Sequence, residues 1–192
     1  MTDAGTHFLE AFEVERRRLS IATQRGIGMP MAGLLFWLGV AWLTRRFPAE
    51  QAALYSFFLT GVVFPIGMLF TRIAGGDLFA KSPGLTPLGA LLAALQFFYW
   101  PMIILVFNLS PAWTPWVMAV LFGAHFLPYA WLYRSRAYAF LTISVAVSLS
   151  ALVVIARGPM PTVVPLVTAA CYGVAIVWMW RENQGLSRRP TD

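Results

Sequence analysis

The chain alternates between long apolar runs and short polar connections. Six runs approach the roughly 20 mostly apolar residues that a helix needs to cross a hydrocarbon core. They cover residues 27–44, 54–74, 90–110, 116–135, 138–157 and 166–181. The connections contain proline, glycine and charged residues, which are typical of loops. The pattern predicts an all-α membrane protein, a bundle of six transmembrane helices.

The first 26 residues follow a different pattern. Phe8, Phe12 and Leu19 recur at helical spacing beside several glutamates and arginines. This pattern predicts an amphipathic helix on the inner leaflet. A solvated charged arm is the alternative, because the apolar stripe is short. The predicted organisation is a cytoplasmic amphipathic arm (1–26), a six-helix transmembrane domain (27–181) and a cytoplasmic tail (182–192).

Basic residues indicate how the spans are oriented. Eleven of the lysines and arginines lie before the first span, in the second and fourth connections, or after the last span, and three lie on the opposite side. Cytoplasmic segments are enriched in lysine and arginine. Both termini are therefore predicted to face the cytoplasm, an N-in/C-in topology that six spans satisfy. Tryptophans and tyrosines near the predicted span ends agree with the topology.

Composition strengthens the membrane assignment. Hydrophobic residues make up 59% of the chain and charged residues 11%, against about 45–50% and about 25% in soluble domains. The net charge is +6, but the basic residues lie at the ends of apolar segments rather than in one patch. Their placement predicts contact with anionic membrane lipids and no binding of nucleic acid.

The sequence lacks the residue patterns of most enzymes and ion-coupled transporters. All eight acidic residues lie outside the predicted spans or at their edges, which argues against a proton-driven cation exporter. The chain has no metal-ligand spacing, no phosphate-binding glycine loop and no hydrolase motif. We therefore predict no metal and no cofactor; enzymatic activity is left undecided, and the sequence disfavours it.

Three neighbouring spans carry a proline or a histidine near their midpoints. Pro65, Pro101 and His125 fall at nearly the same predicted depth. A proline inside a helix frees one backbone carbonyl, and a freed carbonyl in lipid needs an internal partner or water. These positions predict breaks in spans two to four and a cavity between those spans.

A polar and aromatic stripe would line this cavity. His125, Tyr129 and Tyr133 are spaced four residues apart on the fourth span. On the third span, Gln96 is expected level with Tyr129, and Tyr99 level with His125. These five residues are the predicted ligand-binding set. The alternative is that His125 makes only a hydrogen bond between helices.

A second candidate group lies at the inner mouth of the bundle. Arg72, Asp77 and Lys81 surround a glycine pair in the longest connection between spans, and Arg134 lies at the same predicted level. This group is predicted to gate the cavity or to bind a lipid phosphate. A solvated loop with anchoring charges is the alternative.

Several segments carry a resemblance to a known family. The stretch GAHFLPYAWLYRSRAY at 123–138, FPIG at 64–67 and the basic ERRR at 15–18 resemble a family of small bacterial six-span membrane proteins with no assigned function. The resemblance covers most of the chain. It implies a multi-pass protein of the bacterial inner (cytoplasmic) membrane and adds no catalytic residues.

These observations support two functional hypotheses. The first is a protein that binds or permeates a small neutral or amphipathic molecule or a lipid in the midplane cavity. The alternative is a non-enzymatic accessory or assembly protein that packs through the small-residue faces of spans five and six. A lipid-processing enzyme using His125 is disfavoured, because no nucleophile or metal ligand lies beside it. Membrane lipids are the expected partners, and a small-molecule ligand and a homo-oligomer stay open.

Overall fold

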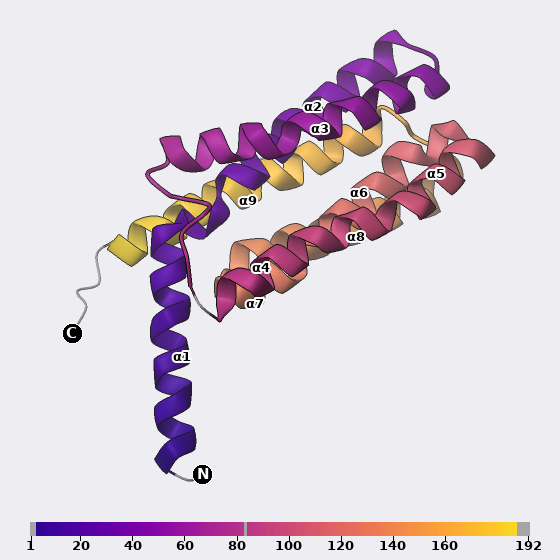
Figure 1. Cartoon of the computed structure of the whole chain (residues 1–192). Helices are drawn as coiled ribbons and strands as arrows, with labels where there is room; N and C mark the ends of the chain where they lie inside the picture. The colour runs from indigo at the N-terminus through magenta and orange to yellow at the C-terminus, as the bar shows by residue number, and fades with distance from the viewer. Residues whose placement is uncertain (1–2, 83, 188–192) are drawn as a thin grey trace.

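The computed structural model describes residues 3–82 and 84–187, which form helices joined by turns (Figure 1). The elements are α1 (Asp3–Ala22), η1 (Gln24–Gly26), α2 (Gly28–Arg46), α3 (Ala49–Ile73), α4 (Leu85–Ala94), η2 (Leu95–Tyr99), α5 (Trp100–Leu109), η3 (Pro111–Trp113), α6 (Thr114–Ala124), α7 (Leu127–Leu132), α8 (Arg136–Ala156) and α9 (Val163–Ser187). Of the predicted tail, residues 188–192 lie outside the described residues.

Six helical segments are long and apolar enough to cross a membrane, which confirms the predicted fold class. They are Gln24–Arg46, Ala49–Ile73, Leu85–Leu109, Pro111–Leu132, Arg136–Ala156 and Val163–Gly185. The second, third and fourth spans begin about five residues earlier than the hydropathy pattern indicates. The difference arises because polar residues and prolines fit the first turn of a helix, where Pro87 and Pro115 lie.

Two of the three predicted breaks are present. In the third span, the 3₁₀ segment η2 separates α4 from α5 just before Pro101. In the fourth span, α6 ends at Ala124 and α7 begins at Leu127, next to Pro128. The predicted break at Pro65 is wrong, because α3 continues through this residue. One proline removes a single helical hydrogen bond, and the other backbone hydrogen bonds of this long helix remain.

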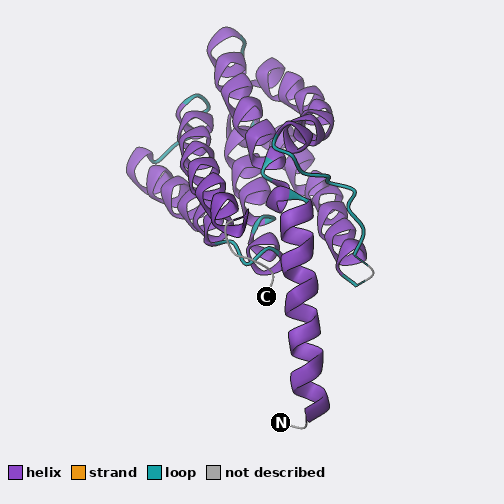
Figure 2. Cartoon of the chain, turned by 90° about the vertical axis from the view of Figure 1, so that its left-hand side faces the viewer, coloured by secondary structure: helices purple, strands orange, loops and turns teal. Residues whose placement is uncertain are grey.

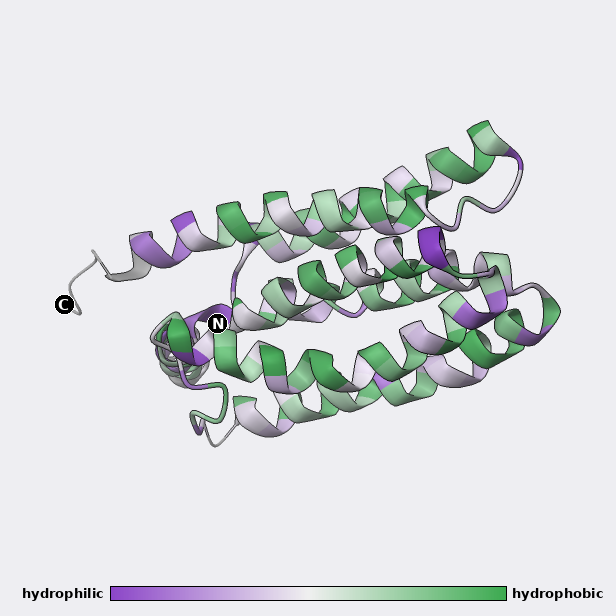
Figure 3. Cartoon of the chain, turned by 90° about the horizontal axis from the view of Figure 1, so that it is seen from above, coloured by the Kyte–Doolittle hydropathy of each residue, from purple (hydrophilic) through white to green (hydrophobic). Residues whose placement is uncertain are grey.

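The core lies between α2, α9, α6 and α8. α2 packs against α3 on one side and α9 on the other, and α9 also packs against α8. Trp37, Val40, Met118, Leu141 and Met179 are fully buried among these helices. Within the 18-residue apolar window of each span, 56% of the residues are buried in the span that contains α2 and only 6% in Leu85–Leu109. Hydrophobic residues cover the length of the bundle, and hydrophilic ones gather toward its ends (Figure 3). The chain is therefore a multi-pass membrane protein.

α1 leaves one end of the bundle crosswise to the spans, and α9 ends at this same end (Figures 1 and 2). We call it the terminal end. The predicted apolar stripe of α1 continues from the bundle outward. Leu19 is buried, Phe12 lies 5.9 Å from the Trp131 ring, and Phe8 is 68% exposed. The amphipathic placement of α1 on a leaflet, and the N-in/C-in topology, stay predictions.

Candidate functional site

His125 at the break in the fourth span has both ring nitrogens engaged. Its Nδ1 lies 2.6 Å from the carbonyl oxygen of Phe122, and its Nε2 lies 2.6 Å from the side-chain nitrogen of Gln96. A carbonyl oxygen can only accept, so Nδ1 carries the proton and Nε2 accepts a hydrogen bond from the Gln96 amide. The third and fourth spans are thus joined by a polar contact, as in the alternative interpretation of His125.

The contacts between these two spans differ from the predicted register. Gln96 meets His125 rather than Tyr129, and the Tyr129 hydroxyl donates to the carbonyl of Gly89 at 3.2 Å. The predicted register is therefore wrong by about one turn. The reason is that both spans begin about five residues earlier than the hydropathy pattern indicates, which shifts the midpoints from which the register was predicted. Tyr99 is partly buried at the edge of the core.

The predicted aromatic stripe forms a continuous column of rings. The ring centroids of His125 and Tyr129 are 6.0 Å apart, as are those of Tyr129 and Tyr133. The column continues to Tyr138 on α8, which is 6.0 Å from Tyr133. Burial raises the pKa of the Tyr133 phenol, against a smaller opposing effect of its hydrogen bond with Thr23. These rings pack on one another, and their role in ligand binding stays a prediction.

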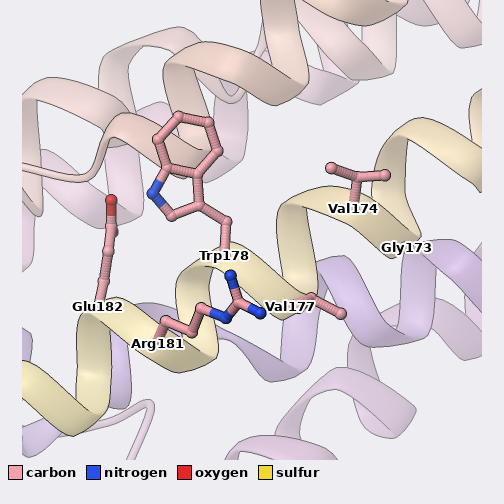
Figure 4. A pocket seen from close by; sticks show the side chains of 6 residues that line it. All are labelled: Gly173, Val174, Val177, Trp178, Arg181 and Glu182. Atoms are coloured by element: carbon pink, nitrogen blue, oxygen red, sulfur yellow. The ribbon is translucent and has the colours of Figure 1, made fainter.

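A hollow of about 680 Å³ lies on the outer face of α9 rather than at His125 (Figure 4). It is lined by Gly173, Val174, Val177, Trp178, Arg181 and Glu182. None of the five predicted ligand-binding residues borders it. Sequence analysis missed this set, although Gly173, Val177 and Arg181 follow one another at four-residue intervals. That spacing puts a small, an apolar and a basic residue on one helix face.

At the terminal end, a buried arginine joins segments that are distant in the sequence. Arg25 donates from Nη1 to the Asn183 side-chain oxygen at 2.8 Å and from Nε to the Tyr133 carbonyl at 3.2 Å, and its Nε is 4.0 Å from a Glu182 oxygen. Its side chain is 9% exposed. Sequence analysis treated Arg25 only as a charge that orients the spans.

The backbone around Arg25 is held by the same neighbours. Gln24, Arg25 and Gly26 have φ values of 49°, 52° and 63°, in the left-handed region that costs non-glycine residues about 1–2 kcal/mol each. The Tyr138 hydroxyl donates to the Arg25 carbonyl at 2.7 Å, and the Asn183 amide donates to the Gln24 carbonyl at 2.9 Å. These contacts stabilise the reversal that turns α1 into α2.

Glu182 connects α9 to the beginning of α8. One carboxylate oxygen accepts from the Ser135 hydroxyl at 2.6 Å, and the other accepts from the backbone N–H groups of Arg136 at 3.0 Å and Ala137 at 3.3 Å. A carboxylate at a helix N-terminus satisfies free N–H groups and matches the helix dipole. We name Arg25, Tyr133, Tyr138, Glu182 and Asn183 the terminal-end network.

α1 docks on α7 through Arg16 and Glu13. Arg16 donates to the carbonyls of Trp131 and Leu132, and its guanidinium lies 4.6 Å from the Trp131 ring centroid. Glu13 pairs with Arg16 and with Arg134, each at 2.7 Å. These contacts fix the angle at which α1 leaves the bundle.

The inner-mouth group does not come together as one cluster. Arg134 is paired with α1, and an Asp77 oxygen accepts from the Phe79 backbone N–H at 2.9 Å. Among residues 3–82 and 84–187, Asp77 and Lys81 form no ion pair with each other. The binding of a lipid phosphate by this group, including Arg72, stays a prediction.

The contact between His125 and Gln96 can be measured with a double-mutant cycle. We expect the unfolding free energies of His125→Ala, Gln96→Ala and the double variant, measured in detergent, to give a coupling of about 1 kcal/mol. Pairing His125→Ala with Asn108→Ala is the control, because Asn108 is exposed and bonds its own helix at Ile104. A coupling of zero for His125 and Gln96 would contradict the bond.

Comparison with known proteins gives one family. Neither the curated proteins nor the solved structures include a match to the chain. The model of a family of unknown function, DUF7010, matches residues 12–182, from the second half of α1 to the terminal-end network. This protein therefore belongs to the family of unknown function DUF7010.

Proposed function

We propose that this protein is a non-enzymatic accessory membrane protein, which acts through contacts at its outer surface and does not pass a solute through its centre. The observation that carries the proposal is the pairing of the midplane polar groups. His125 accepts a hydrogen bond from Gln96 and donates one to the Phe122 carbonyl, and the Tyr129 hydroxyl donates to the Gly89 carbonyl. A permeating or bound solute would have to break these bonds, at a cost for each unsatisfied buried group.

The outer surface offers a large area for such contacts. Within the 18-residue apolar window of each span, only 17% of the residues are buried in the span of α3 and 6% in the span of α4 and α5. Phe58, Phe97 and Phe98 are among the exposed side chains there. In the proposed arrangement both termini face the cytoplasm of a bacterial cell, the bundle crosses the inner membrane, and α1 rests on the inner leaflet with Phe8 in the lipid.

The competing function is binding or permeation of a small neutral or amphipathic molecule at His125. The test places the full chain in vesicles of phosphatidylcholine and phosphatidylglycerol. Light scattering then follows how fast the vesicles shrink and recover their volume after glycerol or urea is added outside. We expect the same rates as for protein-free vesicles, both for the natural chain and for His125→Ala. Faster recovery with the natural chain that His125→Ala abolishes would overturn our proposal in favour of a midplane pathway.

A further inference from the structure

The hollow on α9 combines an apolar wall with a basic end. Val174 and Val177 are each about half exposed, and Trp178 is 39% exposed. At Gly173 an added β carbon would meet no atom within 4 Å, so the missing side chain leaves open space. Figure 4 shows the Arg181 side chain lying along α9 toward Val177, near the base of Trp178. The guanidinium thus lies beside the apolar wall instead of pointing beyond the end of the helix.

Arg181 has no counter-ion in the part of the chain that the structure describes. Arg181 takes no part in the ion pairs that Arg16, Arg18, Arg25 and Arg134 form with glutamates. The neighbouring acid, Glu182, is already bound to Ser135 and to the first N–H groups of α8. A cation at the edge of the hydrocarbon is costly unless an anion or water satisfies it.

We propose that this hollow binds one anionic phospholipid. The Arg181 guanidinium binds the phosphate through its planar pair of N–H donors. The Trp178 indole lies at the level of the glycerol and headgroup, which is where tryptophan concentrates in membranes. One acyl chain runs along Val177 and Val174 into the space at Gly173. The site is separate from the midplane residues and from the inner-mouth group.

The length of the hollow fits an acyl chain in one leaflet. Eight residues separate Gly173 from Arg181, which at about 1.5 Å per residue is a rise of roughly 12 Å. One leaflet contributes about half of a hydrocarbon core of about 30 Å. A phosphate at Arg181 therefore puts the acyl chain end near Gly173, close to the middle of the membrane.

The test measures which lipid the full chain retains. The protein is purified in detergent with equal amounts of phosphatidylglycerol and phosphatidylcholine, and native mass spectrometry counts the lipids that stay bound. We expect the natural chain to retain more phosphatidylglycerol than phosphatidylcholine. In Arg181→Gln the ratio of the two retained lipids should fall about fivefold, which is the effect of one basic residue at an anionic surface. Gly173→Leu keeps the charge but fills the space, so it should lower retention of both lipids.

Two matched variants separate this site from general effects. Arg46→Gln removes the same charge from the last turn of α2, and Gly61→Leu adds the same side chain at another helical glycine with no atom within 4 Å. Both should behave like the natural chain. Equal loss in Arg46→Gln and Arg181→Gln would overturn the proposal, as would equal retention of the two lipids by the natural chain. Dimers that Gly173→Leu abolishes would assign the hollow to a second copy instead.

Discussion

Replacing Arg25 with alanine is expected to lower the free energy of unfolding by about 3–5 kcal/mol, the usual cost of removing one member of a buried charged contact. The guanidinium joins Asn183, the Tyr133 carbonyl and Glu182. Without it, these groups stay buried with part of their hydrogen bonding lost. Chemical unfolding of the purified protein in detergent measures the change.

Two control variants show whether the geometry or only the charge of Arg25 matters. Arg25→Lys keeps the charge but lacks the planar fork that reaches two acceptors, so its stability should fall between those of the natural chain and Arg25→Ala. Arg18→Ala removes an arginine whose side chain is 73% exposed and 3.7 Å from Glu15, and it should cost well under 1 kcal/mol. If Arg25→Ala were as mild as Arg18→Ala, the terminal-end network would not stabilise the fold.

The spans could be predicted from the sequence because crossing a membrane depends on a local property, the length of an apolar run. The breaks near Pro101 and Pro128 could be predicted for a similar reason, since proline removes a bond of its own helix. Pro65 shows the limit of this argument. Whether a helix breaks at a proline also depends on the helix around it, and α3 continues for eight residues beyond Pro65.

The candidate sites depend on contacts that no local pattern encodes. Gln96 and His125 were both chosen from the sequence, but their pairing depends on where the third and fourth spans begin, which the hydropathy pattern places about five residues too late. The terminal-end network is even harder to predict from the sequence. Arg25 and Asn183 are 158 positions apart, and their meeting depends on how α9 packs against α2. The sequence therefore predicted the chemistry of individual residues better than their partners.

Replacing Gly28 with alanine is expected to cost about 2–3 kcal/mol, in the range of overpacked sites. A β carbon there would overlap the backbone of Gly67 and Thr71 on α3, so α2 and α3 would have to separate at this close contact. Gly61→Ala on the same α3 is the control, because its β carbon would meet no atom within 4 Å. It should be neutral or gain about 0.5–1 kcal/mol from helix propensity. Thermal unfolding in detergent compares the two variants, and equal stabilities would contradict the close α2–α3 contact on which the first helical hairpin depends.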